Sequence, residues 1–452
     1  MRIIVVGCGK IGEALVARLN EETNDITVVD EDAAKVKSVA NKYDSLGVVG
    51  NGATRQVQQE AGVDKADLLI AVTGSDEINL LCCLMAKKRG NCRTIARLRN
   101  PEYYSDARYL KEELGLEMVI NPEYATACEI TRILNFPSAI NIETFAKGRV
   151  ELLKFKLPEG SPLVGMSVRE AITKLRCNVL FCTIERGEDA FIANGEFVFA
   201  EKDVISIIAS PRSAISFFKK IDLHIQPVKD VLLLGGAEMT HYLCDMLSRS
   251  GIKVKIIERT RERAEELAAE FDNITVIHAN PSDEDTLKEE GIETAGGIVS
   301  LTKFDEENIL LSLFAKRVSA GKVVTKINRT EYDDIINHLE LDSTVYPTNI
   351  VADTIARYVR ATTNRRGNNM ENLYNVIKGK VIAAEFTVSE SSPLIGKPLS
   401  ELSLKSDVLI AAILRDRSMI IPRGSDMFSA GDSVIIATKL LGIQDLSDIV
   451  KK

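Results

Sequence analysis

The sequence contains no tryptophan, few other aromatic residues and only four histidines among its 452 residues. Its eight cysteines include no Cys-x-x-Cys pair and no other spacing typical of zinc ligands. We therefore expect the cysteines to be small buried side chains of a protein kept in a reducing compartment. The shortage of histidine also leaves few candidates for acid–base catalysis.

Long hydrophobic runs are missing as well. The longest apolar stretches, such as Val204–Ala209 and Val231–Leu234, have the length of a strand and fall far short of the roughly 20 residues that cross a bilayer. The first residues lack the charged segment, apolar segment and cleavage site of a secretory signal. We expect a cytoplasmic protein, and any association with a membrane must go through a partner.

Positive charge is not in excess, since the formal net charge is −8 and the isoelectric point is near 5.4. This balance argues against a general nucleic-acid or anionic-membrane surface, although it leaves room for a local basic patch. Hydrophobic residues make up 45% of the chain and charged residues 27%, which is ordinary for a soluble protein. The length allows two to four domains.

The most informative stretch present is the beginning of the chain. A β-branched apolar run over 2–6 stops at a Gly-x-Gly-x-x-Gly segment, and residues 13–19 continue with helical spacing. Gly7 allows the tight turn, Gly9 lets the backbone approach a pyrophosphate, and Gly12 lets the helix pack close to the strand. The helix amino terminus offers free N–H groups to phosphate. The full segment is Gly7, Cys8, Gly9, Lys10, Ile11 and Gly12.

An acidic residue follows at the spacing that a nucleotide site requires. Asp30 ends a second predicted strand eighteen residues after Gly12, where its carboxylate can accept hydrogen bonds from a ribose diol. Glu31 and Asp32 come next, so that three acids without an arginine would face a 2′-phosphate, and NADP is disfavoured. Lys10 either adds charge near the phosphates or is a solvated residue at the helix start.

Later strand ends add further candidates, because the carboxyl ends of parallel strands meet at one crevice. Asn51 and Gly52 follow the third predicted strand, and Thr73 and Gly74 follow the fourth. Asn51-Gly52 also has the composition of a plain tight turn. Arg97 lies near the end of the fifth strand, where its guanidinium can reach the phosphates or pair with an acid.

The alternation of strands and helices predicts an α/β, Rossmann-like unit with a parallel sheet over 1–137. Residues 138–225 have a different sequence pattern, with short β-rich runs and one predicted helix near 167–175. This pattern predicts a small α+β module.

This two-part unit then repeats. The same offset of 228 residues separates Gly7 from Gly235 and Asp30 from Glu258, and a turn at 161–165 recurs at 392–396. We therefore expect a second Rossmann-like domain over 226–362 and a second small α+β module over 363–452. The polar stretch 362–369 is predicted to be a mobile loop or hinge.

The second copy departs from the first where a ligand would bind. Ala237 and Thr240 replace the second and third glycines, Glu238 replaces Lys10, and Pro281 stands in place of Gly52. The methyl group of Ala237 leaves less room for a pyrophosphate beside the backbone, and the carboxylate of Glu238 repels it. We expect the second site to be weaker, altered or empty. Lys326 aligns with Arg97 and keeps a positive charge without the bidentate fork.

The chain resembles the TrkA family, the regulatory subunits of Trk potassium-uptake systems, over essentially its whole length. The features that carry the resemblance are the glycine turn with its acid, the Thr-Gly-Ser-Asp-Glu-x-Asn segment at 73–79, the Ala-Arg-x-Arg-Asn-Pro segment at 96–101 and the duplicated Ser-Pro-Leu-x-Gly turn. The resemblance implies a nucleotide-binding regulator that is not an enzyme.

The resemblance also implies ligands and partners. NAD(H), or alternatively ATP or ADP, is expected at residues 7–11, Asp30, Thr73, Gly74 and Arg97. A second ligand is expected near Gly235, Gly236, Ala237 and Glu258. Rings of eight units are usual in the family, so a chain with two units would form a homotetramer on a TrkH-type membrane potassium-translocating subunit.

Two other functions compete with regulation. The same glycine turn serves NAD-dependent oxidoreductases, but none of the four histidines lies in the first Rossmann-like unit. The small modules contain scattered acids, such as Glu188, Asp189 and Asp432, which suggest a weaker alternative of a metal or cyclic dinucleotide site.

Overall fold

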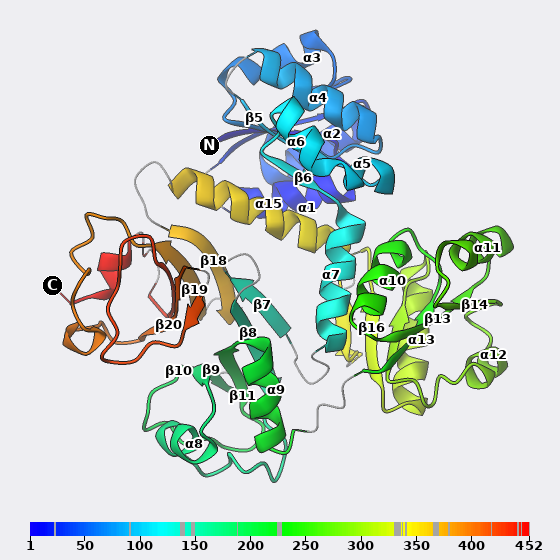
Figure 1. Cartoon of the computed structure of the whole chain (residues 1–452). Helices are drawn as coiled ribbons and strands as arrows, with labels where there is room; N and C mark the ends of the chain where they lie inside the picture. The colour runs from blue at the N-terminus through cyan, green and yellow to red at the C-terminus, as the bar shows by residue number, and fades with distance from the viewer. Residues whose placement is uncertain are drawn as a thin grey trace. The chain divides into compact units, whose positions relative to one another are not determined.

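A computed structural model describes residues 1–451 apart from 22–23, 90–91, 136–140, 146–149, 188, 224–227, 330–335, 337, 340, 365–369, 378–379, 417, 441–442 and 444. Its strands form four sheets, two parallel and two antiparallel, and the chain divides into two compact units (Figure 1). One unit holds 1–134 and 228–356, and the other holds 135–227 and 357–452. The predicted fold class, two tandem Rossmann-like domains each followed by a small α+β module, is confirmed.

The first Rossmann domain has a parallel sheet of strand order β3-β2-β1-β4-β5-β6. This order places the ends of β1 and β4 side by side, which is where the order reverses and where ligands bind in such sheets. Its elements are β1 (Arg2–Val6), α1 (Lys10–Asn20), β2 (Asp25–Asp30), α2 (Ala33–Tyr43), β3 (Leu46–Val49), α3 (Arg55–Glu60), a 3-10 turn (Val63–Lys65), β4 (Leu68–Ala71), α4 (Asp76–Arg89), β5 (Arg93–Arg97), α5 (Pro101–Ser105), α6 (Ala107–Leu114), β6 (Met118–Ile120) and α7 (Pro122–Asn135).

The second Rossmann domain repeats this order as β14-β13-β12-β15-β16-β17. Strands β12 and β15 are buried along their apolar runs, as expected for a parallel sheet covered on both faces. Its elements are β12 (Asp230–Leu234), α10 (Thr240–Arg249), β13 (Lys253–Glu258), α11 (Arg261–Glu270), β14 (Thr275–His278), α12 (Glu284–Glu289), β15 (Gly297–Ser300), α13 (Asp305–Val318), β16 (Lys322–Lys326), β17 (Ser343–Val345) and α15 (Pro347–Asn364).

The two Rossmann domains exchange their last helices. Ala127, Ile130 and Leu134 of α7 are fully buried in the core of the second domain, although α7 follows the first sheet. Helix α15 lies alongside α1 of the first domain (Figure 1), where Arg18 donates a hydrogen bond of 2.6 Å to Asp353. The second domain therefore depends on α7 of the first for part of its apolar core, and an ion pair joins α15 to the first domain.

The small modules are antiparallel sheets of matching topology, β10-β9-β11-β8-β7 and β18-β19-β22-β20-β21. They share an apolar core, since residues of both modules belong to one buried cluster. The elements are β7 (Asn141–Phe145), β8 (Val150–Lys156), α8 (Val168–Leu175), β9 (Val179–Arg186), β10 (Asp189–Ile192), β11 (Val204–Ala209), α9 (Pro211–Lys220), β18 (Met370–Ile377), β19 (Val381–Thr387), a 3-10 turn (Leu399–Glu401), β20 (Val408–Arg415), β21 (Ser418–Ile420), β22 (Ser433–Thr438) and a 3-10 turn (Leu446–Ile449).

Some expectations for individual elements were wrong. The expected hinge at 362–369 is helical up to Asn364, and its remainder lies outside the described residues. The first small module contains a second helix, α9, whose phenylalanines pack into the module core and which the sequence pattern did not reveal. Of the acids that suggested a metal or cyclic dinucleotide site, Glu188 lies outside the described residues. Asp432 is buried and accepts two hydrogen bonds from Arg415.

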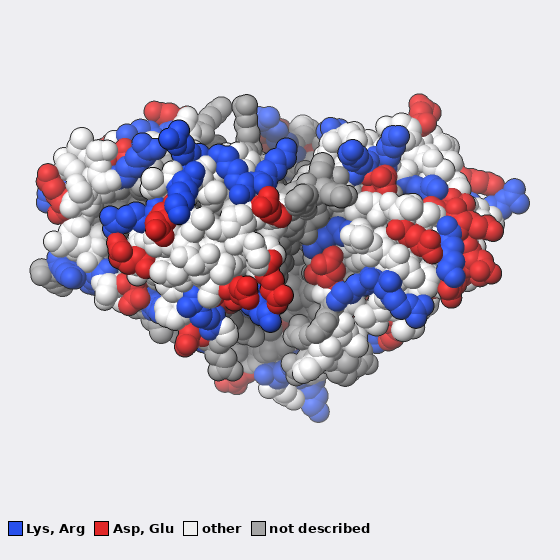
Figure 2. Space-filling model, turned by 90° about the horizontal axis from the view of Figure 1, so that it is seen from below, with Lys and Arg blue, Asp and Glu red and all other residues white. Residues whose placement is uncertain are grey.

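The charged surface agrees with the mixed composition. On the face shown in Figure 2, Lys and Arg side chains alternate with Asp and Glu, and acidic side chains gather at one edge. Helix α12 and its flanks supply exposed acids of this kind at 283–285 and 289. Among the described residues, no helix combines the length and the apolar character needed to span a bilayer.

Because α7 of the first domain packs in the core of the second, we expect a substitution in α7 to destabilise the second domain. Leu134→Ala removes a buried side chain that packs against β15 of the second domain, and we expect a loss of about 2–5 kcal/mol of unfolding free energy. Hydrogen exchange should then quicken in β12 and β15 more than in β1 and β4. The control is Leu81→Ala, because Leu81 is 47% exposed on α4. Faster exchange confined to the first domain would contradict the exchange of helices.

The buried thiols give a second prediction. Burial raises the pKa of Cys82, Cys182 and Cys244 from 9.0 to about 12, and that of Cys92 to about 11. A thiol reagent at pH 8 should therefore modify the half-buried Cys177 first, because burial raises the pKa of the half-buried Cys128 as well. Because the unfolded thiols ionise near pH 9 and the folded ones near pH 11–12, the contribution of these thiols to the unfolding free energy should be constant below pH 9 and fall as the pH rises to 12. Denaturant unfolding over this range measures the effect.

Candidate nucleotide-binding crevices

The glycine turn of the first domain has the geometry that its sequence predicts. Gly7 has a φ of +107°, and a Cβ there would press on the backbone of Val72 and Thr73 at 3.0 Å. A Cβ at Gly12 would lie 1.8 Å from the Gly7 carbonyl oxygen, so only glycine lets α1 start this close to β1. A Cβ at Gly9 would meet nothing within 4 Å, which leaves the backbone open to a ligand.

A carboxylate ties this turn to the neighbouring strand. Asp30 Oδ2 accepts a hydrogen bond from the Cys8 backbone N–H at 2.7 Å, and its Oδ1 accepts one from the Asp32 N–H at 3.0 Å. Burial, and then the Asp30 charge, raise the pKa of the Cys8 thiol to about 12, so this thiol stays neutral beside the carboxylate. The carboxylate at the end of β2 thus holds the turn and keeps oxygen lone pairs for a ribose.

A cavity of about 670 Å³, the first crevice, gathers most of the predicted residues. Its volume lies in the range of small-molecule sites. Cys8 and Gly12 are not part of its lining, since Cys8 bonds to Asp30 through its backbone and Gly12 packs against Gly7. The predicted residues that do line it are Gly7, Gly9, Lys10, Ile11, Asp30, Asn51, Gly52, Thr73, Gly74 and Arg97.

Two of these residues, Asn51 and Gly52, also form the tight turn after β3. The Asn51 side chain accepts a hydrogen bond from the Ala53 N–H at 2.8 Å, as in an Asx turn. A Cβ at Gly52 would lie 2.3 Å from the Val6 side chain. The tight-turn interpretation of this pair therefore has direct support, while both residues remain in the wall of the first crevice.

One hydrogen-bond donor of Arg97 has no partner among the described residues. Its Nη1 donates to the Thr73 carbonyl oxygen at 3.3 Å, but its Nε is buried without a partner among the described residues. Burial lowers the pKa of Arg97 and raises the pKa of Glu123, which faces it from the start of α7. A phosphate at this end of the crevice would give the guanidinium the partner that it lacks.

The second domain closes the first crevice from the opposite side. Asn328, Pro347 and Thr348 line it, together with Pro122 and Glu123 of the exchanged helix α7. Sequence reasoning missed these residues, because no local motif signals a wall supplied by another domain. A ligand in the first crevice would contact both Rossmann domains.

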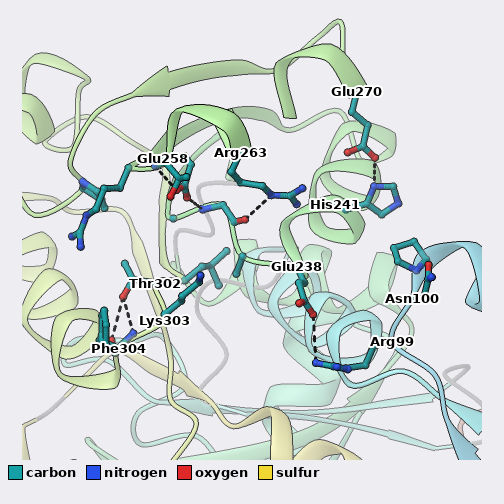
Figure 3. A pocket seen from close by; sticks show the side chains of 18 of the residues that line it. Arg99, Asn100, Glu238, His241, Glu258, Arg263, Glu270, Thr302, Lys303 and Phe304 are labelled. Atoms are coloured by element: carbon teal, nitrogen blue, oxygen red, sulfur yellow. Dashed lines mark hydrogen bonds and ion pairs between the residues drawn. The ribbon is translucent and has the colours of Figure 1, made fainter. Parts of the chain in front are cut away.

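The second crevice is a larger cavity of about 1110 Å³ above the second sheet. Gly235, Gly236, Ala237 and Glu258 all line it, and the two domains share its wall, because residues 74–77 and 99–102 of the first domain lie across from them. Glu258 repeats the role of Asp30, since its carboxylate accepts hydrogen bonds from the backbone N–H groups of Gly236 and Thr260. Figure 3 shows Glu258 and Arg99 on different sides of this cavity.

The helix after the second glycine turn begins later than its counterpart. Helix α1 starts at Lys10, whereas α10 starts at Thr240, which is equivalent to Gly12. The reason is steric, because any side chain at the position of Gly12 would collide with the turn if the helix began as early as α1. The first free N–H groups of the helix thus lie at different positions in the two domains.

Lys326 does not take the place of Arg97. Although it aligns with Arg97, Lys326 is 6% exposed and is not part of the wall of the second crevice. Burial lowers the pKa of its ammonium group, and the acids Asp305 and Glu123 oppose this effect. The two crevices therefore differ in charge as well as in shape.

Comparison with known proteins agrees with this geometry. The TrkA-N domain model matches residues 3–122 and 231–347, and the TrkA-C domain model matches 152–222 and 383–451. The chain belongs to the TrkA family. The Trk system potassium uptake protein TrkA of Haemophilus influenzae is 31% identical over 445 residues, covering 96% of this chain and 95% of that protein. A TrkA homolog of Archaeoglobus fulgidus is 29% identical over 452 residues, covering 100% of both chains.

Solved structures support the fold of this TrkA-family chain. The GsuK RCK domain covers 97% of this chain and 92% of its own, with a TM-score of 0.62 at 17% identity. The GsuK channel bound to NAD covers 97% of this chain and 76% of its own, with the same TM-score and identity. Membership of the TrkA family makes the chain a regulatory potassium-uptake protein and not an enzyme, so the oxidoreductase alternative is set aside.

The glycine geometry yields a matched pair of substitutions. Gly12→Ala forces a Cβ against the Gly7 carbonyl, and we expect it to cost about 1–3 kcal/mol of stability. Gly9→Ala enters open space at a φ of −73°, so stability should stay within about 0.5 kcal/mol of the parent while nucleotide binding weakens. Denaturant unfolding and calorimetric titration with NADH measure the two effects. Unchanged binding by the folded Gly9→Ala chain would argue against a phosphate at this turn.

Proposed function

We propose that the chain is the cytoplasmic gating subunit of a Trk-type potassium uptake system, which couples binding of NAD(H), or alternatively of ATP or ADP, in the first crevice to potassium movement through a membrane partner. The observation that carries the proposal is the double wall of the first crevice. The carboxylate of Asp30 and the open turn at Gly9 belong to one domain, and Asn328 and Thr348 belong to the other.

Such a ligand acts by selecting an arrangement of the two Rossmann domains. It needs only to bind one arrangement more tightly than another, and about 5.5 kcal/mol of differential affinity moves a two-state equilibrium from 1:99 to 99:1. Hydrogen bonds to charged groups contribute about 1.5–3 kcal/mol each, so a few phosphate and ribose contacts suffice.

The nucleotide is NAD(H) in this proposal. The dimensions of the first crevice suit a dinucleotide, and the GsuK channel, which shares the fold, has been solved with NAD and with ADP. Both ligands present an adenosine ribose that Asp30 can hold. NADP is disfavoured in this proposal, because Asp30 and Glu31, which line the first crevice, would repel a 2′-phosphate.

The partner is a TrkH-type potassium-translocating subunit in the membrane, and the chain meets it at the inner face of the membrane. We propose that four copies assemble, so that eight Rossmann domains complete one ring. The proposed domain limits are those of the sequence: 1–137, 138–225, 226–362 and 363–452.

Substitution of Asp30 tests the proposal. Asp30→Ala removes the ribose acceptor, and we expect NADH affinity to fall about tenfold to a hundredfold, with loss of nucleotide-dependent potassium flux in vesicles that contain the membrane partner. Asp30→Asn keeps one acceptor for the Cys8 N–H, so its NADH affinity should fall less than that of Asp30→Ala.

The matched control is Asp32→Asn, because Asp32 caps α2 and does not line the first crevice. It should bind NADH and support flux as the parent does. If both Asp30 variants keep parental affinity and flux, the proposed site is wrong. Steady consumption of NADH with a carbonyl substrate by the purified parent would instead revive an enzymatic function.

A further inference from the structure

Gln58 is a buried polar residue on the short helix α3 of the first domain, and it is 1% exposed. Its Nε2 donates one hydrogen bond of 2.8 Å to the Gly52 carbonyl oxygen and another of 2.9 Å to the Cys82 carbonyl oxygen. Gly52 belongs to the turn after β3, and Cys82 lies on α4 one helical turn after Ile78. Gly52 and Ile78 both line the first crevice. The amide group of Gln58 therefore ties together two parts of the crevice wall.

The oxygen atom of the same amide group is unsatisfied. Gln58 Oε1 is buried and has no hydrogen-bond partner among the described residues, which is unfavourable for a buried acceptor. The second domain avoids this penalty. Helices α3 and α12 begin at 55 and 284, an offset that pairs Gln58 with Leu287, and Leu287 is also 1% exposed. The fold therefore does not require an amide at this position, and the two bonds that Gln58 donates need another explanation.

The turn after β3 supplies that explanation, because Gly52 needs a restraint from outside. A Cβ at Gly52 would lie 2.3 Å from the Val6 side chain, so the turn has to use glycine, the residue with the most backbone freedom. The second domain has Pro281 at the equivalent position, and the proline ring fixes φ there. The two domains thus restrain the same turn by different means, a hydrogen bond from Gln58 in the first and a proline in the second.

The turn lies on the side of the first crevice that faces the base of a nucleotide. Strand β2 is placed between β3 and β1, and the Gly50 N–H donates a hydrogen bond of 2.9 Å to the Asp30 carbonyl oxygen. A nucleotide with its ribose on Asp30 and its phosphates at the glycine turn after β1 extends its base towards the β3 side. Asn51 and Gly52 form the crevice wall on that side.

We propose that Gln58 is a positioning residue of the first crevice, whose amide group holds the Gly52 carbonyl against α4 and so fixes the wall that receives the base of a bound nucleotide. Gln58 does not line the first crevice itself, so it acts through Gly52. The inference rests on the proposed function in placing the ribose on Asp30. Phosphates at Gly9 lie beyond β2 from the Gly52 wall, so Gln58 affects binding of the base and not of the phosphates.

Gln58→Leu separates these two parts of the ligand. The substitution removes both donor bonds and introduces the side chain that the second domain has at this position. NADH affinity should fall about threefold to tenfold, the factor expected for loss of hydrogen bonds between neutral groups. ADP-ribose carries the same base and ribose, and its affinity should fall by the same factor. Pyrophosphate has no base, so its affinity should equal that of the parent, whereas a purely structural role of Gln58 would weaken all three ligands together.

The experiment uses the full chain and follows NADH by its fluorescence. ADP-ribose and pyrophosphate are measured as competitors that displace NADH, so that all three ligands report on the same crevice. Gln58→Met is the second variant, because methionine lacks the donors but keeps the unbranched shape of glutamine. The matched control is Gln56→Leu, the same substitution at an exposed position of α3, which should bind all three ligands as the parent does. Thermal unfolding without ligand should show that both Gln58 variants remain folded.

Three outcomes would overturn the inference: parental NADH affinity in both Gln58 variants, an equal loss of NADH and pyrophosphate affinity, or unfolding of both variants at ambient temperature. Asp30→Ala distinguishes this failure from failure of the proposed function. If Asp30→Ala weakens NADH binding and the Gln58 variants do not, the proposed function stands and the inference fails. If Asp30→Ala and the parent bind NADH equally, the proposed function fails, and the ribose position on which the inference rests fails with it.

Discussion

The geometry of both crevices depends on one interaction, a carboxylate at the end of the second strand that accepts a hydrogen bond from the backbone of the glycine turn. Asp30 makes it to Cys8 at 2.7 Å, and Glu258 makes it to Gly236. The first glycine of the turn has a positive φ in both domains, which glycine adopts without a steric penalty. The N–H groups of the turn need acceptors, and the carboxylate supplies one. Because the same carboxylate is the proposed ribose acceptor, ligand binding and turn conformation are directly linked.

Divergence of the two copies follows from small steric changes on this common frame. Gly12 permits the first turn of α1, and Thr240 at the equivalent position is accommodated by a later helix start. The fold survives, since the sheet order and the carboxylate are kept. The position of the first helical N–H groups changes, and these are the groups that a helix amino terminus offers to a phosphate. Substitutions in one copy thus alter its crevice while the domain fold is kept.

Much of the fold could be predicted from the sequence, because local chemistry determines it. Apolar runs of strand length and the repeat offset gave the parallel sheets and the tandem order, and strand β11 has the predicted limits Val204–Ala209. Errors arose where tertiary contacts decide. On α4 the apolar Leu81 is 47% exposed, while the polar Asn79 is buried and donates a hydrogen bond to the Arg97 carbonyl oxygen.

The candidate sites show the same division. The glycines and the acid of each crevice could be found from spacing, since they belong to one βαβ unit. Asn328, Thr348 and Arg99 could not, because each contributes to the crevice of the other domain and the exchange of α7 and α15 leaves no periodic signal. A residue's alignment with its counterpart was also misleading, since Lys326 is buried outside the second crevice whereas Arg97 lines the first.

The two crevices share a wall, and this has a thermodynamic consequence. Gly74 and Ser75 line both cavities, and the Gly74 carbonyl fixes Arg99 while the Thr73 carbonyl accepts from Arg97. A ligand that displaced this loop from one crevice would therefore move the arginine side chain that lines the other. Whatever factor one occupant applies to the affinity of the second crevice, the occupant of the second must apply to the first, because coupling free energy is reciprocal. Any such coupling runs through Gly74 and Ser75, the residues that line both crevices.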